Sequence, residues 1–286
     1  MSSSFVTGII PFTYFVTEQK PVGSTALRVD NLTACAPDFR KWVHGAKYDA
    51  LIFQKAYWKE MMELFQGPKI LDLCDPDWLR ESIDIIELGS LVHAVTCSSR
   101  PLTELMQGYF PGKPVVYVPD RLLPSAFPPP RGPHSGPARK AVWFGFIHNA
   151  CASLPSLVPA LKAHCMELTI LSNEPYPEED EVAALRPDFI RYDPATAYTR
   201  IRDFDVVLNP RSQRAFFKYK SLNKSLIAWQ LGLPVAVTPN DLDRLADPEV
   251  RNREVQAQQA LIAREYHIEQ SAAQYRELLQ SLRHNL

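Results

Sequence analysis

A run of basic residues precedes the short apolar segment 225–238, and side chains of this type suit the binding of an anion. Between Leu208 and Lys224 the sequence holds no Asp or Glu. The cations of this stretch are Arg211, Arg214, Lys218, Lys220 and Lys224. A helix N-terminus already carries partial positive charge, so lysines there raise the local potential unless an anion lies among them. The stretch predicts a phosphate or diphosphate site, with a solvated basic loop as the alternative.

Small and polar residues complete this predicted phosphate site. Ser221 or Asn223 can cap the helix that follows, and Gly232 can end it in a left-handed turn. Gly145 follows another apolar run, where the lack of a side chain lets backbone N–H groups approach a phosphate. The sequence contains no GxGxxG or GxxxxGK[ST] pattern, which argues against a standard dinucleotide site or a P-loop.

One carboxylate and one histidine are the candidates for catalysis, and a second carboxylate is a candidate on the acceptor side. Asp75 and Asp77 follow a predicted strand, where Asp75 could orient or deprotonate an acceptor hydroxyl and Asp77 would lie on the acceptor side. A turn role before proline is the alternative for Asp75. His148 could contact a donor phosphate or sugar, or have no role in the site. No Ser-His-Asp or Cys-His order stands out, so the sequence does not favour a hydrolase.

The N-terminal region offers a further candidate for contact with an anion. Gly23, Ser24 and Arg28 stand at a predicted loop-to-helix start. Arg28 would grip an anionic acceptor or a donor phosphate. The alternative is an arginine whose stem covers apolar surface while its head reaches water.

Short apolar runs must position these residues, and they form two series along the chain. The runs lie at 5–12, 48–54, 69–75, 93–99 and 114–120, then at 140–146, 167–173, 188–193, 204–210 and 233–239. Apolar runs of this length without alternation are typical of parallel strands covered on both faces. Helical patterns lie between the runs. The sequence therefore predicts an α/β fold with two Rossmann-like, doubly wound domains.

The composition limits the class of protein. The 286 residues carry a net charge of −1, with 46% hydrophobic and 22% charged residues, which is typical of a globular protein that stays in solution. Five cysteines without a CxxC pair indicate reduced thiols and a cytoplasmic location. We expect no signal peptide and no membrane span, because no basic start with an apolar run and no long apolar segment is present.

Several segments resemble the two-domain glycosyltransferases of the GT-B architecture, in particular the glycosyltransferase family 4-like group. The likeness is carried by AVTCSSRPLTELMQGYFPGKPVVYVPD, KAVWFGFIHNACASLPSLVPAL, YTRIRDFDVVLNP and KSLNKSLIAWQLGLPVAVTP. It implies an acceptor domain at 1–123 and a donor domain at 140–262 that face a cleft, with a helix at 263–286 returning to the first domain. The Pro-, Gly- and Ser-rich segment 124–139 would be the linker.

The resemblance also implies a reaction and a donor site. A sugar would move from a nucleotide-sugar, a UDP-hexose, to an acceptor hydroxyl with retention of configuration and without a metal cofactor. The residues implied to bind the donor are Gly145, Arg211, Lys220, Ser221, Asn223 and Lys224 at the diphosphate, and Asn173 and Tyr192 near the nucleoside. Many family members carry two glutamates around this helix, where the present sequence has Tyr219 and Ile227, so their ribose contact is not implied here.

The acceptor is less constrained by the sequence. Residues 40–48 form a basic and aromatic stretch that includes Trp42 and Tyr48, and its cations and rings suit a phosphate backbone and exposed bases. The members are Arg40, Lys41, Trp42, His44, Lys47 and Tyr48. We favour a hydroxymethylated base of viral DNA in a host cytoplasm. The alternatives are a surface polysaccharide or small glycan as acceptor, an inactive nucleotide-binding module, and core packing of the two aromatic residues.

Overall fold

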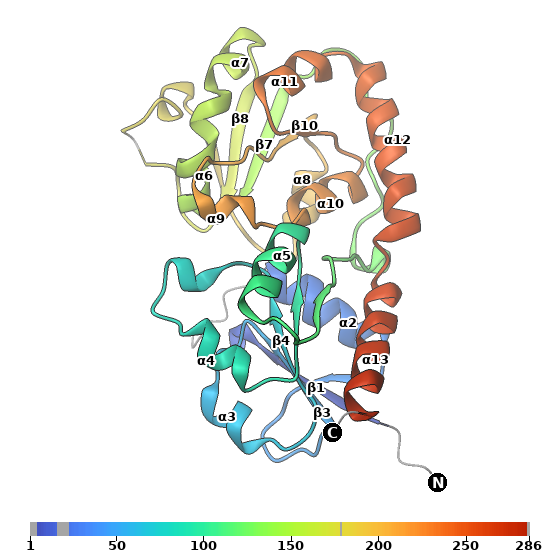
Figure 1. Cartoon of the computed structure of the whole chain (residues 1–286). Helices are drawn as coiled ribbons and strands as arrows, with labels where there is room; N and C mark the ends of the chain where they lie inside the picture. Colours follow the sequence, from blue (N-terminus) through green and yellow to red (C-terminus); the bar gives the residue numbers. More distant parts are fainter. Residues whose placement is uncertain (1–4, 16–22, 178, 285–286) are drawn as a thin grey trace. The chain divides into compact units, whose positions relative to one another are not determined.

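The computed structural model describes residues 5–15, 23–177 and 179–284. The chain divides into two compact units, and neither unit is continuous in sequence (Figure 1). The first unit comprises Met1–Leu123, Arg214–Asn223 and Tyr266–Leu286. The second comprises Pro124–Gln213 and Lys224–Glu265, so the segment expected to be a linker belongs to this unit.

The first unit is built on a parallel sheet, which in the described residues has the strand order β2-β1-β3-β4-β5-β6. Its strands are β1 (Thr7–Pro11), β2 (Phe39–Lys41), β3 (Ala50–Gln54), β4 (Lys69–Leu73), β5 (Ala94–Cys97) and β6 (Val115–Tyr117). All residues of β3 are buried, as expected of a strand with helices on both faces. The order reverses between β1 and β3, because the chain first adds β2 on one side of β1 and then builds outward on the other.

Helices and short helical turns cover this sheet. They are η1 (Phe12–Phe15), α1 (Gly23–Thr25), η2 (Ala26–Asp30), α2 (Asn31–Cys35), α3 (Lys59–Leu64), η3 (Asp77–Leu79), α4 (Ile85–Ser90), α5 (Arg100–Tyr109), α9 (Ala215–Lys218) and α13 (Ile268–His284). The Ser99 hydroxyl accepts from the N–H of Leu102 and so caps α5. Helix α13 packs beside α2 and buries Ile268, Ala272 and Tyr275 in the core of this unit (Figure 1).

The second unit contains another parallel sheet, with the described strand order β11-β10-β7-β8-β9. Its strands are β7 (Lys140–Gly145), β8 (Glu167–Ser172), β9 (Asp188–Arg191), β10 (Val206–Leu208) and β11 (Val235–Ala236). The order reverses at β7, since β8 and β9 lie on one side of it and β10 and β11 on the other. Ligands of open α/β sheets bind beyond the carboxyl ends of the strands at such a reversal.

The helices of the second unit include one that begins in the first. They are η4 (Pro124–Ala126), α6 (Ile147–Ser153), η5 (Leu154–Leu157), α7 (Val158–Ala163), η6 (Ala183–Leu185), α8 (Ala197–Ile201), α10 (Asn223–Gln230), α11 (Pro239–Leu245) and α12 (Pro248–Glu265). Thr238 and Asp241 form a capping box at the start of α11. Gly232 follows α10 with φ +82°, the left-handed turn expected from the sequence.

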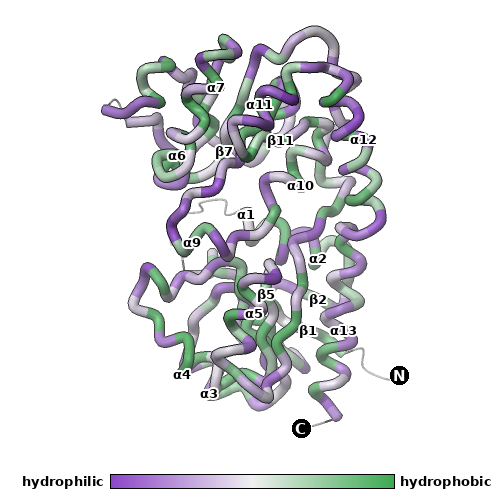
Figure 2. Tube along the Cα trace, turned by 45° about the horizontal axis from the view of Figure 1, so that its top comes forward, coloured by the Kyte–Doolittle hydropathy of each residue, from purple (hydrophilic) through white to green (hydrophobic). Residues whose placement is uncertain are grey.

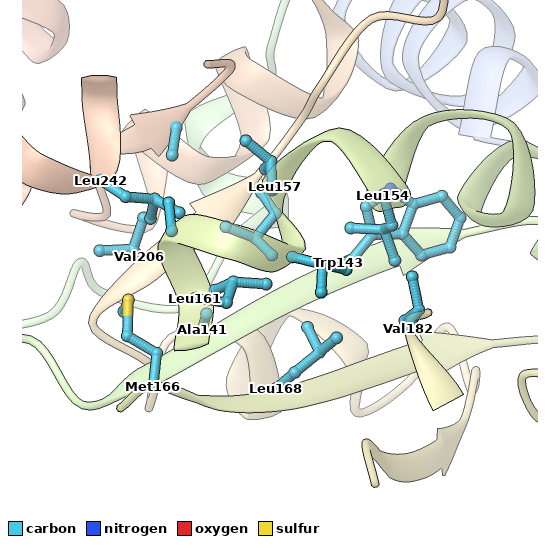
Figure 3. Close-up of a cluster of buried hydrophobic side chains, with 14 of the residues drawn as sticks. Ala141, Trp143, Leu154, Leu157, Leu161, Met166, Leu168, Val182, Val206 and Leu242 are labelled. Carbon is cyan, nitrogen blue, oxygen red and sulfur yellow. The ribbon is translucent and has the colours of Figure 1, made fainter. Parts of the chain in front are cut away.

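The core of the second unit lies between β7, β8 and the helices of segment 147–163. Figure 3 shows Trp143 of β7 beside Leu154, with Leu157 and Val182 in the same cluster. Trp143 is only 1% exposed. This packing holds the carboxyl end of β7 in place, and Gly145 is the last residue of that strand.

The segment 124–139 is tied to the second unit by hydrogen bonds. The N–H of Arg131 donates to the carbonyl of Leu231 at 2.8 Å. The N–H of His134 donates to Oδ1 of Asn252 at 2.7 Å, and Nδ2 of Asn252 donates back to the His134 carbonyl at 3.0 Å. A buried guanidinium, that of Arg251, donates to the carbonyl of Gly136 at 2.6 Å. These hydrogen bonds attach the segment 124–139 to the second unit at several points along its length.

The predicted fold class is confirmed, since both sheets are parallel and carry helices between their strands. Each of the ten apolar runs singled out in the sequence contains a strand. Figure 2 shows hydrophobic residues recurring between hydrophilic ones along α13, which is typical of a helix with one buried face. Among the described residues, no helix combines the length and apolar character needed to cross a bilayer.

Candidate functional site

Gly145 and Lys224 meet at the carboxyl end of β7, where the strand order of the second sheet reverses. Gly145 has φ +139°, a conformation that side chains rarely adopt. A Cβ atom on this residue would lie 2.8 Å from Nζ of Lys224. The lysine ammonium therefore lies directly over the glycine backbone.

The aromatic ring of Trp143 supports the Lys224 side chain. Nζ lies 3.9 Å from the centre of this ring and 5.8 Å from that of Phe144. A cation over an indole face is attracted by the ring quadrupole, which holds the ammonium in one place. Lys224 is half-buried, so its charge is partly shielded from water. Such a positioned cation beside a bare backbone suits a phosphate oxygen.

Asn173 lies at the same edge of the sheet, because Ser172 of β8 is the register partner of Gly145. Its Oδ1 accepts from the N–H of Ile147 at 3.0 Å and from the Ser172 hydroxyl at 3.1 Å. Its Nδ2 donates to Oε1 of Glu174 at 3.0 Å. The amide thus links the first turn of α6 to the end of β8.

The other residues predicted for the donor domain lie at strand ends of the second sheet. Tyr192 follows β9 and its N–H donates to the Ser172 carbonyl at 2.8 Å, while burial raises the pKa of its phenol. Arg211 follows β10. His148 is exposed in the first turn of α6 and stacks on Phe146, with ring centres 5.9 Å apart. All three are placed on the carboxyl side of the sheet.

Helix α10 is attached to β10 through a pair of side chains. Nδ2 of Asn209 donates to the Ser225 hydroxyl at 3.0 Å, and both residues are buried. The helix begins at Asn223, whose N–H donates to the Ser221 hydroxyl at 3.4 Å. The boundary between the two units falls between Asn223 and Lys224, so the predicted phosphate residues are divided between the units.

The basic segment 214–223 is anchored in the first unit. Nζ of Lys220 lies 3.5 Å from Oδ1 of Asp75, and burial lowers the pKa of this lysine despite the carboxylate. The Ser99 hydroxyl donates to the carbonyl of Tyr219 at 2.6 Å. The guanidinium of Arg80 lies 3.4 Å from the centre of the Phe216 ring. These contacts show why the segment clusters with residues from the N-terminal half.

Asp75 and Asp77 share a lysine at the carboxyl end of the first sheet. Nζ of Lys55 lies 3.0 Å from Asp75 and 2.9 Å from Asp77, and the Tyr57 hydroxyl donates to Asp77 at 3.0 Å. Burial opposes the ionisation of Asp75, but Lys220 and Lys55 outweigh it and lower the pKa to about 2. Burial raises the pKa of Asp77. An Asp75 carboxylate of such low pKa is a weak base, so its placement favours holding Lys220 over accepting a proton.

Arg28 lies inside the first unit, with its side chain 3% exposed. Its guanidinium donates to both oxygens of Asp72 at 2.5 and 2.8 Å and to Asp120 at 3.0 Å. It also donates to the hydroxyl of Tyr275 at 3.2 Å, which ties α13 to the sheet. Burial opposes the charge, yet Asp72 outweighs it and raises the pKa of Arg28. These contacts give Arg28 a structural role, and its expected grip on an anion stays a prediction.

The remaining acceptor-side candidates lie in α1 and beside β2 of the first unit. Gly23 and Ser24 begin α1, and Ser24 is buried. Trp42 is 9% exposed and packs in the core. The hydroxyl of Tyr48 donates to the carbonyl of Lys41 at 3.2 Å, and its ring packs against the same core. The core interpretation of the two aromatic residues is therefore correct.

Three residues of these sites were not singled out from the sequence. Lys55 lies between the two aspartates, and its position directly after a predicted strand was a usable signal. Trp143 was predicted only as part of a strand, and Glu174 lies just beyond the predicted run 167–173. Within the described residues, no group of three or more His, Cys, Asp or Glu side chains is placed to hold a metal ion.

No protein-family model matches the chain, and no curated protein matches it. Solved structures do share its fold. Anabaena HepE in complex with UDP-glucose superimposes with a TM-score of 0.68 at 11% identity, over 96% of this chain and 99% of HepE. An alpha-glucosyltransferase in complex with UDP and a 13-mer DNA containing an HMU base superimposes with a TM-score of 0.53 at 9% identity. The match covers 81% of this chain and 80% of the alpha-glucosyltransferase.

A third structure is larger than this chain. A mutant of S. aureus TarM, in complex with Fondaparinux, alpha-GlcNAc-glycerol and UDP, gives a TM-score of 0.62 at 12% identity. The match covers 80% of this chain but 55% of TarM, so the chain spans about half the length of that protein. At these identities the likeness is one of fold, the two-sheet α/β architecture of GT-B glycosyltransferases. The family 4-like subgroup stays a prediction.

Proposed function

We propose that the protein is a glycosyltransferase that moves a hexose from a UDP-sugar to an acceptor hydroxyl. The contact between Lys224 and Gly145 carries this proposal. A lysine held by an aromatic ring over a bare backbone, at the strand reversal of an open sheet, offers a fixed positive charge for a diphosphate. The fold shared with structures that contain UDP or UDP-glucose supports this choice of ligand.

In this proposal the residues of the second unit have distinct roles. Lys224 and Arg211 neutralise the diphosphate, and their charge stabilises it as it leaves. Gly145 lets the phosphate approach the backbone. Asn173 and Tyr192 lie further along the same edge, on the side of the nucleoside. Lys220 and Ser221 belong to the first unit, where Asp75 lies 3.5 Å from the Lys220 ammonium, and their contact with the diphosphate stays a prediction.

Titration calorimetry with UDP tests the donor site. Wild-type protein should bind UDP, and Lys224→Ala should weaken binding roughly 10- to 100-fold, since a hydrogen bond to a charged group contributes about 1.5–3 kcal/mol. Lys162→Ala is the matched control, because Lys162 is an exposed cation of the same unit on α7. Unchanged UDP affinity in Lys224→Ala would remove the phosphate assignment.

Turnover separates an enzyme from an inactive module. Wild-type protein incubated with UDP-glucose should release UDP, either by transfer or by slow hydrolysis, and Lys224→Ala should release less. Binding without any release would favour a nucleotide-binding module on the same fold.

For the acceptor we propose a hydroxymethylated base in DNA. The fold likeness to an alpha-glucosyltransferase in complex with HMU-containing DNA supports it, whereas the buried Trp42 ring leaves no stacking surface at that position. The test is incubation with a panel of UDP-sugars and hydroxymethylated DNA, followed by digestion and mass measurement of the nucleosides. No mass gain with any sugar removes this acceptor and directs the search to glycans.

A further inference from the structure

Glu174 presents a carboxylate at the same edge of the second sheet as Gly145. It comes two residues after Ser172, the partner of Gly145 in the β7–β8 pairing, and its side chain is exposed. Its Oε1 accepts from Nδ2 of Asn173 at 3.0 Å. The carboxylate is therefore both positioned by the protein and open to a ligand.

The orientation of the Asn173 amide follows from its partners. The N–H of Ile147 can only donate, so the atom it contacts at 3.0 Å must be the amide oxygen. The Ser172 hydroxyl donates to the same oxygen at 3.1 Å. With its oxygen held twice, Asn173 must point its NH₂ group toward Glu174, where it fixes one carboxylate oxygen.

Two other carboxylates near this edge are engaged by the protein's own donors. Asp193, after β9, accepts from the N–H of Ala195 at 3.1 Å and from the Thr196 hydroxyl at 2.9 Å. Asp241, after β11, caps α11 through Thr238. These two carboxylates organise turns and helix ends. Glu174 differs from these two carboxylates. The Asn173 amide binds its Oε1 and so orients the carboxylate, while its second oxygen, Oε2, is left for a ligand.

A nucleotide-sugar needs such an acceptor. Lys224 supplies a donor for phosphate oxygens, as the proposed function requires, and the ribose of the same ligand carries two hydroxyl groups that can donate to a carboxylate. We propose that Glu174 accepts a hydrogen bond from a ribose hydroxyl of the donor nucleotide, with Asn173 as its positioning residue. This inference rests on the proposed function. It makes Glu174 the residue that distinguishes a ribonucleotide from its deoxygenated analogue.

The experiment compares the affinities of UDP and 2′,3′-dideoxy-UDP by titration calorimetry. Wild-type protein should bind UDP about 10-fold or more tightly than the analogue, because a hydrogen bond to a carboxylate contributes about 1.5–3 kcal/mol. Glu174→Ala should reduce this ratio to about 2 or less. Glu167→Ala is the matched control, since Glu167 is an exposed glutamate at the opposite end of β8.

A second variant tests the positioning role. Asn173→Asp keeps an oxygen for the Ile147 N–H but removes the donor to Glu174. It should lower the ratio of the two affinities, while any general effect of its added charge acts equally on both diphosphates. A structural disturbance alone would change both affinities and leave the ratio unchanged, which would overturn the positioning role.

The outcomes distinguish this inference from the proposed function. If wild-type protein binds UDP but shows no preference over the analogue, or if Glu174→Ala keeps the wild-type ratio, the role of Glu174 is wrong and the donor site stands. If wild-type protein does not bind UDP at all, the proposed function itself fails, and the inference with it.

Discussion

Arg28 and Asp72 form a buried, two-pronged ion pair in the first unit, with N–O distances of 2.5 and 2.8 Å. The same carboxylate accepts from the hydroxyls of Thr96 at 2.7 Å and Tyr275 at 3.0 Å. One side chain thus joins the sheet, the π-helical turn that carries Arg28, and the C-terminal helix α13.

Removal of this carboxylate should destabilise the protein strongly. Asp72→Ala leaves Arg28 with less compensation for its buried charge, and breaking a buried pair typically costs about 3–5 kcal/mol. Urea denaturation should show this loss. Asp38→Ala is the control, because it breaks an exposed ion pair with Arg276 of α13. The loss in the free energy of unfolding should stay below about 1 kcal/mol there. Equal losses in the two variants would contradict this account.

Gly145→Ala should impair the donor site more than the fold. The added methyl group would lie 2.8 Å from Nζ of Lys224, and the ammonium can move aside only by leaving its place over Gly145. We expect roughly 10-fold weaker UDP binding in calorimetry.

Gly112→Ala is its control. Gly112 also has a positive φ, +89°, but the space that a Cβ atom would occupy there is open. Both variants should lower the melting temperature through backbone strain. Weaker UDP binding in Gly112→Ala as well would mean that the effect of Gly145→Ala arises from lost stability.

Asp75→Asn should loosen the basic segment 214–223. Lys220 would lose the carboxylate that lies 3.5 Å from its ammonium, while Lys55 would keep Asp77. Limited trypsin digestion with mass spectrometry should then show faster cleavage after Arg214, Lys218 or Lys220. Glu81→Gln, an exposed change of the same charge, should leave the cleavage rate as in wild type. An unchanged rate in Asp75→Asn would show that Ser99 and Arg80 suffice to anchor the segment.

His134 should make the stability of the protein depend on pH below neutrality. Its side chain is buried, and burial lowers the pKa from 6.5 to about 4. Its Nε2 donates to the Gly232 carbonyl at 3.0 Å, whereas its Nδ1 is buried without a hydrogen-bond partner among the described residues, so a second proton placed there would have no acceptor. The unfolded chain binds a proton at higher pH than the folded chain does. Stability is therefore complete above pH 6.5 and falls as the pH drops toward 4.

His134 alone can change the free energy of unfolding by at most about 1.4 kcal/mol per pH unit. Urea denaturation at pH 5.5 should therefore show about 1 kcal/mol less stability than at pH 7.5. His134→Gln removes the titrating group and should flatten that part of the profile. A profile in His134→Gln with the same slope as wild type would assign the dependence to other groups.

The sequence predicted the strands well because most of them are buried on both faces. A strand such as Ala50–Gln54 reads as an uninterrupted apolar run, and that run is sufficient to locate it. The missed strand, Phe39–Lys41, is short, and only Phe39 is buried. Its two exposed cations made the segment look like part of a nucleic-acid surface, although it is the edge of a sheet.

The candidate site was harder to predict, because its partners are distant in sequence. Arg28 was read as a ligand residue, yet its partners Asp72, Asp120 and Tyr275 lie 44, 92 and 247 positions away. Charge pattern alone cannot show such pairing. The sequence showed the basic run 211–224, but it did not show that this run is divided between two units. The carboxylate near Lys220 is that of Asp75, which comes from the N-terminal half of the chain.

The return of the C-terminal helix α13 to the first unit has a consequence for synthesis on the ribosome. The strands of the first sheet emerge early, but the helix that covers Ile9 and Ile52 is made only after the whole second unit. During translation this apolar surface must stay exposed or be shielded by a chaperone. Truncations that end before Ile268 would leave it bare permanently, so such fragments should aggregate rather than fold.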